Sequence, residues 1–87
     1  MEEKMQMAID KANKKFVEEG CCFQAEPMLT KDRLATIYID FGDWKHEHGY
    51  ADYVMSENGF KKTKEEVTEE DGSDCYSSIH TYYFCKS

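Results

Sequence analysis

Proline, glycine and positive charge are all scarce in this chain of 87 residues. It has one Pro and five Gly, and its 11 Lys and Arg stand against 18 Asp and Glu, for a net charge of −7. That charge disfavours direct binding of nucleic acid, whose phosphates attract cations. No apolar run approaches the roughly 20 residues of a membrane-spanning helix, which argues against a membrane protein. One Trp, six Tyr and five Phe supply too much apolar surface for an unfolded chain, so we expect a single folded domain over 1–87.

Motifs that carry chemistry are missing as well. The chain has no Gly-x-Ser-x-Gly, no phosphate-binding glycine loop and no His-Glu-x-x-His. Ser77, Ser78 and His80 are close in sequence, but their spacing alone places no oxyanion hole. With so few residues an ordinary substrate pocket is hard to build. We therefore expect no enzymatic activity and no cofactor.

The four cysteines form no Cys-x-x-Cys pair, the spacing typical of zinc sites and of thioredoxin-like redox sites. They are Cys21, Cys22, Cys75 and Cys85. We expect reduced thiols, some of them buried, with a disulfide or a metal site as alternatives. Adjacent cysteines on an extended segment point to opposite faces, so Cys21 and Cys22 are not expected to share a site. The charged start of the chain lacks the features of a secretory signal, which favours a cytoplasmic protein.

Hydrophobic periodicity predicts the first half of the fold. Residues 2–19 have an amphipathic helical stripe that ends at Gly20. Residues 21–28 and 34–41 indicate two strands joined by a polar turn. In the second strand the core face is expected to consist of Ala35, Ile37, Ile39 and Phe41. A second helix is expected over 44–57, or only from Tyr50 if Gly49 delays its start.

The C-terminal third indicates a hairpin. Residues 60–69 favour an edge strand, with a third helix as the alternative, and residues 74–85 favour a long strand that is central or has a contact surface on its outer face. Asp71-Gly72 suits a two-residue turn. Such a turn would pair Glu70 with Ser73, Val67 with Tyr76 and Phe60 with Tyr83.

This order predicts an α+β fold, α-β-β-α-β-β, with a four-stranded antiparallel sheet and both helices on one face. It is a circular permutation of the ferredoxin-like split β-α-β plan. One face of the sheet would then lie bare, carrying Tyr38, Asp40 and one side of 74–85.

Negative charge is concentrated in the second half of the chain. Residues 1–33 have net charge −1, and residues 34–87 have net charge −6. The simplest interpretation is a solvated edge that resists aggregation. The alternative is a surface that meets a basic protein partner, with binding residues Glu65, Glu66, Glu69, Glu70, Asp71, Asp74, Tyr76 and Tyr82. Acids spaced like phosphates would make the domain, as monomer or homodimer, an inhibitor by nucleic-acid mimicry, such as a phage-encoded antagonist of a CRISPR nuclease.

A second functional hypothesis comes from residues 40–48, which combine histidines with acids. Asp43, His46 and His48 are candidate ligands for a metal or a small molecule, and His80 could add a third ligand beside the two histidines. On a helix, residues two apart point about 200° apart, so His46 and His48 could share an ion only if this segment is an extended loop.

Overall fold

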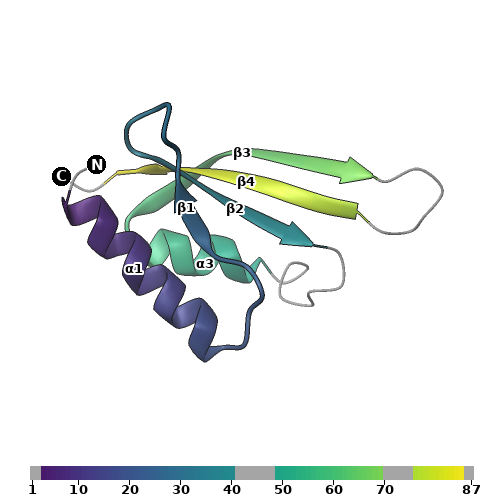
Figure 1. Cartoon of the computed structure of the whole chain (residues 1–87), viewed down its shortest axis with the longest axis horizontal. Coiled ribbons are helices and arrows are strands. Elements are labelled where there is room, and N and C mark those ends of the chain that lie inside the picture. The colour runs from purple at the N-terminus through teal and green to yellow at the C-terminus, as the bar shows by residue number, and fades with distance from the viewer. Residues whose placement is uncertain (1–2, 41–48, 70–75, 86–87) are drawn as a thin grey trace.

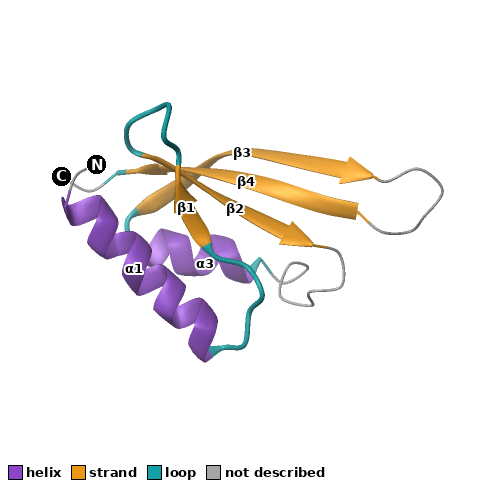
Figure 2. Ribbon diagram, in the orientation of Figure 1, coloured by secondary structure: helices purple, strands orange, loops and turns teal. Residues whose placement is uncertain are grey.

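The structure, a computed structural model, describes residues 3–40, 49–69 and 76–85, without the side chains of Thr68, Glu69 and Tyr76. Within these ranges the elements are α1 (Glu3–Glu18), β1 (Ala25–Pro27), β2 (Leu34–Asp40), α3 (Tyr50–Glu57), β3 (Phe60–Glu69) and β4 (Tyr76–Phe84). The strands form an antiparallel sheet in the order β1-β2-β4-β3. Both helices lie on the same side of it (Figures 1 and 2). The predicted α+β fold is confirmed, and the strand order is that of the permuted plan.

Helix α1 forms because its apolar residues recur on one face. Its buried residues are Met5, Ala8, Ile9, Ala12 and Phe16. The helix ends where Gly20 adopts the left-handed region, with φ +75°. The N–H of Cys21 then donates to the carbonyl of Phe16 at 2.9 Å, and the N–H of Gly20 donates to that of Val17 at 3.1 Å. These two bonds satisfy carbonyls that the helix end would otherwise leave unpaired.

The core lies between the helices and the two central strands. The odd residues of β2 that the structure describes, Ala35, Ile37 and Ile39, are buried as predicted, and Phe41 lies outside the described residues. On β4 the even residues Ser78, His80, Tyr82 and Phe84 are buried. The opposite residues of both strands therefore form the other face of the sheet.

Two predicted boundaries change. The strand expected over 21–28 is only Ala25–Pro27. The Asn13 side chain binds the backbone of Ala25 at its start: it accepts from the N–H at 2.7 Å and donates to the carbonyl at 3.0 Å. Helix α3 begins at Tyr50, the later of the two predicted starts, after Gly49 in the left-handed region. Residues 41–48, with Trp44, lie outside the described ranges.

The predicted hairpin register is wrong. Phe60 pairs with Phe84 rather than Tyr83, and Val67 pairs with Ser78 rather than Tyr76. The inner end is fixed by the Phe60 and Phe84 rings, which are both buried with centroids 5.1 Å apart. A bulge between Lys62 and Lys64 then adds one more residue of offset. The predicted pair of Glu70 with Ser73 lies outside the described residues.

Neither helix in the described part of the chain is long and apolar enough to cross a membrane. The outer strands are built in ways that discourage pairing with another chain. Strand β1 has three residues and ends at Pro27, and β3 is exposed from Lys61 to Val67 with a bulge in its middle.

Candidate functional site

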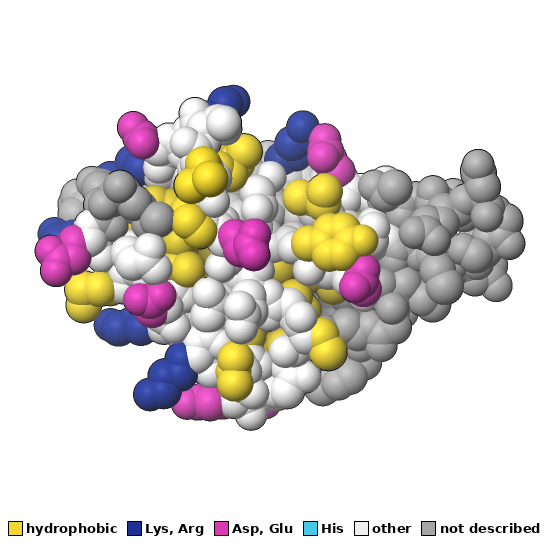
Figure 3. Space-filling model, in the orientation of Figure 1, with side chains coloured by type: hydrophobic (Ala, Val, Ile, Leu, Met, Phe, Trp, Pro, Cys, Tyr) yellow, Lys and Arg dark blue, Asp and Glu magenta, His cyan; other side chains and the backbone are white. Residues whose placement is uncertain are grey.

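The open face of the sheet is the first candidate surface. Among the described elements no helix packs on it, and it exposes Tyr38 (54%) and Tyr83 (43%) with the half-buried Ile79 beside them. Tyr38 lies opposite Ile79 in the register, and the exposed Glu66 lies on the other side of Ile79. Figure 3 shows hydrophobic side chains exposed among single acidic ones in the region where Figure 1 draws the strands. Large rings with polar tips on an open face are suited to contact with a partner.

A groove borders this face beside Tyr38. Its volume is about 300 Å³, and its lining is Cys21, Cys22, Phe23, Gln24, Glu26, Thr36 and Tyr38. The groove lies where residues 21–24, which precede β1 and belong to no strand, pass beside β2. Cys21 and Cys22 both line it, contrary to the expectation that they diverge, because their segment is not a strand. Cys21, Cys22 and Cys85 are not in disulfides, and Cys75 lies outside the described residues.

The predicted acidic surface is divided between two faces. Glu65 lies on the helix side of β3, where its Oε1 is 3.1 Å from the Lys62 ammonium. Glu66 lies on the open face, where it pairs with Lys64 at 2.7 Å. Both carboxylates therefore have intramolecular lysine partners. Glu69 and Tyr76 pair through their backbones at the end of the hairpin, and Glu70, Asp71 and Asp74 lie outside the described residues.

Among the predicted contact residues whose side chains the structure describes, Tyr82 is the one that is buried. Its exposure is 1%, and its hydroxyl donates to Asp52 Oδ1 at 2.5 Å. It faces the helices because the register of β4 against β2 places it opposite the buried Ala35. A buried ring of this kind cannot contact a partner in the folded domain.

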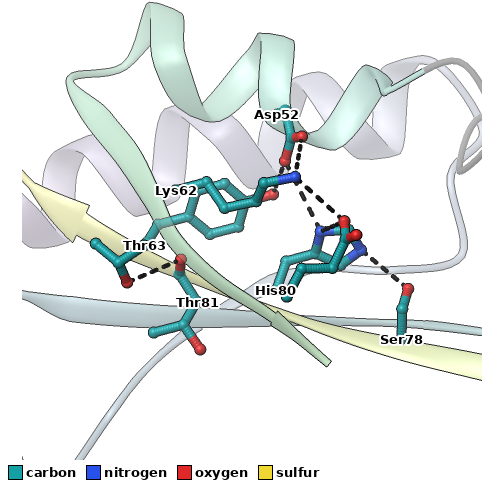
Figure 4. Close-up of polar contacts among 8 residues, drawn as sticks. Asp52, Lys62, Thr63, Ser78, His80 and Thr81 are labelled. Carbon is teal, nitrogen blue, oxygen red and sulfur yellow. Dashed lines mark hydrogen bonds and ion pairs between the residues drawn. The ribbon is translucent and has the colours of Figure 1, made fainter. Parts of the chain in front are cut away.

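Asp52 organises a polar network beneath α3 that the sequence analysis did not identify. Its Oδ2 accepts from the Lys62 ammonium at 2.7 Å, and that ammonium also donates to Glu65 (Figure 4). Burial acts to raise the pKa of Asp52, but bonds from Lys62 and Tyr82 outweigh it, so the pKa is lowered. The bond to Asp52 raises the pKa of Lys62, and burial together with Asp52 raises that of Tyr82. An acid in the first turn of α3 and a lysine on the next strand were the only sequence signal for this network.

The network continues through His80 into a Ser-His-Glu arrangement. Nδ1 of His80 is 3.1 Å from Glu65 Oε1, and Nε2 is 2.9 Å from the Ser78 hydroxyl (Figure 4). These are the connections of a nucleophilic triad. However, Ser78 is 0% exposed and His80 is 4% exposed, so a substrate carbonyl has no approach to the hydroxyl in this state. What the arrangement does supply is a hydrogen bond between two polar side chains that are buried in the sheet.

The metal hypothesis receives no support from the described part of the chain. Asp43, His46 and His48 lie outside it. Within it, no group of three His, Cys, Asp or Glu side chains could hold a metal ion. His80, the possible additional ligand, already contacts Ser78 and Glu65 through its two ring nitrogens.

Comparison with known protein families, with curated proteins and with solved structures gave no match to this chain.

Proposed function

We propose that this chain is a small acidic, non-enzymatic interaction module whose open sheet face binds a protein partner with a basic surface. The observation that carries the proposal is the position of the helices. Both pack on one face, and the other exposes Tyr38 and Tyr83 across the two central strands. The enclosure of Ser78 and His80 argues against catalysis by the polar network.

Charge supports a basic partner. The chain has net charge −7, and Glu26, Asp40 and Glu66 are all exposed on the open face. Complementary charge speeds the encounter of two proteins and orients them before contact. In the described part of this face, the cations Lys61 and Lys64 lie on the edge strand β3, and Arg33 lies over the ring of Tyr83.

We propose, as a more specific form, that the module inhibits a nucleic-acid-binding protein by acidic mimicry in the cytoplasm, as a monomer or homodimer. The support is the net charge of −6 over residues 34–87. Because Glu65 and Glu66 are paired with lysines, mimicry would depend mainly on Glu69, Glu70, Asp71 and Asp74.

The test places an arginine at the centre of the open face. Thr81→Arg changes the middle of β4, and Gln6→Arg makes the same one-unit change of charge on an exposed position of α1. Each variant and the parent chain would be immobilised and incubated with lysate from the source cells, and captured proteins identified by mass spectrometry. We expect capture of a basic protein by the parent and by Gln6→Arg, with at least about a tenfold loss for Thr81→Arg.

Near-UV circular dichroism checks that both variants are folded. Equal capture by Thr81→Arg and the parent would show that the open face is not the binding surface. Duplex DNA added to the complex tests the mimicry form, which requires that DNA displace the chain. A complex that DNA does not displace would be consistent with the interaction module but would refute inhibition by nucleic-acid mimicry.

A further inference from the structure

The groove beside Tyr38 has the composition of a site for a cation. It combines a phenol ring that is 54% exposed, the exposed carboxylate of Glu26 and the amide of Gln24. Among the residues that the structure describes, no Lys or Arg belongs to its lining. A cationic side chain entering the groove would therefore meet an aromatic face and a negative charge without a competing cation on the walls.

The other exposed tyrosine of this face shows what such a contact looks like. The guanidinium carbon of Arg33 lies 5.7 Å from the centroid of the Tyr83 ring, while the guanidinium donates to the carbonyl of Phe84. Within the described residues no Lys or Arg lies over the ring of Tyr38. The exposed ring of Tyr83 is thus in contact with an arginine of the same chain. The exposed ring of Tyr38 instead adjoins a groove whose wall includes the carboxylate of Glu26.

We infer that this groove receives an arginine side chain of the basic partner, with the guanidinium stacked on Tyr38 and paired with Glu26. The inference rests on the proposed function and names its anchor point. Arginine suits the site better than lysine because its planar group can stack on a ring and bind a carboxylate through two N–H groups at once. The volume of about 300 Å³ is sufficient for one such side chain.

A peptide of six arginines is the probe. The chain labelled with ¹⁵N and ¹³C would be titrated with it at low salt, with a peptide of six lysines in parallel. We expect the largest chemical-shift changes at Glu26, Thr36 and the Tyr38 ring, and tighter binding of the arginine peptide. Glu26→Gln and Tyr38→Leu should each lower the affinity for the arginine peptide about two- to fivefold, the range for exposed ion pairs and cation–π contacts.

Matched controls exist on α3, where the exposed Tyr53 neighbours Glu57. Tyr53→Leu and Glu57→Gln change the same groups outside the groove and should leave the affinity unchanged. The inference is overturned if the shifts fall outside the groove, or if Glu26→Gln and Tyr38→Leu bind like the parent. Equal affinity for both peptides would overturn the arginine assignment. Neither result would affect the Thr81→Arg comparison, so failure of the anchor and failure of the interaction module are separable.

Discussion

Lys62 and Glu65 lie three residues apart on β3, yet their side chains meet on the same face of the sheet, with Nζ 3.1 Å from Oε1. In a regular strand, residues three apart point to opposite faces. The bulge between Lys62 and Lys64 removes this alternation, and the Thr63 hydroxyl donates to the carbonyl of Thr81 at 3.3 Å beside it. The bulge thereby brings Glu65 under α3 and leaves Glu66 on the open face.

Charge reversal at these two neighbouring glutamates should have unequal effects on stability. Glu65→Lys places an ammonium beside Lys62 and the buried His80, so we expect the free energy of unfolding to fall by about 1–2 kcal/mol. Glu66→Lys breaks only an exposed pair with Lys64 and should cost less than about 0.5 kcal/mol. Urea denaturation of both variants measures the difference. Because the change of net charge is identical, equal losses would refute the division of the two residues between faces.

Asp52 should make stability depend on acid pH. Its pKa in the folded state lies below the ordinary value of 3.8, so its contribution is present above about pH 4 and is lost as pH falls through the folded pKa. We expect Asp52→Asn to lower the free energy of unfolding by about 1–2 kcal/mol at pH 7, because Lys62 and Tyr82 lose a charged acceptor.

The difference between Asp52→Asn and the parent should shrink as pH is lowered from 5 to 2.5, as followed by chemical denaturation at each pH. Asp10→Asn is the control, since Asp10 is exposed and contacts Gln6 of its own helix. A constant difference between Asp52→Asn and the parent across this range would show that Asp52 does not hold a lowered pKa.

Asn13 should fix the start of β1 against α1. Its amide both donates to and accepts from the backbone of Ala25 in a partly buried position. Asn13→Ala leaves two backbone groups without these bonds and should cost about 1–3 kcal/mol. Amide hydrogen exchange is the sharper measurement: protection at Ala25 should fall more than protection at Ile37, its partner in the register. Gln6→Ala, on the exposed side of α1, should change neither.

Gly20 should be needed for its backbone conformation alone. It has φ +75°, and a Cβ at this position would have no heavy atom within 4 Å. Gly20→Ala therefore costs the left-handed conformation without a steric clash, about 1 kcal/mol. Gly20→Asn should cost less, because Asn tolerates this region better. Thermal unfolding measures both variants. A melting temperature of Gly20→Ala equal to or above that of Gly20→Asn would contradict this explanation of the end of α1.

Much of the fold could be predicted because the local residue patterns each indicate one type of element and one buried face. The apolar stripe of α1 and the alternation of Ala35, Ile37 and Ile39 each specify a buried face directly. Gly49 correctly suggested the late start of α3. These features depend on neighbours within a few residues, which a single sequence contains.

The side on which each polar residue of the hairpin lies was decided only by tertiary structure. A register slip of one residue exchanges the two faces of a strand, and nothing local in 60–69 marks the bulge at Thr63. Packing of Phe60 against Phe84 sets the register of β3 against β4, which places Lys62 near Asp52, and the bulge decides that Glu65 rather than Glu66 lies on the helix side. The pairing of β4 with β2 places Tyr82 on the buried face. The groove at Tyr38 likewise required the spatial approach of residues 21–24 to β2, which no local pattern specifies.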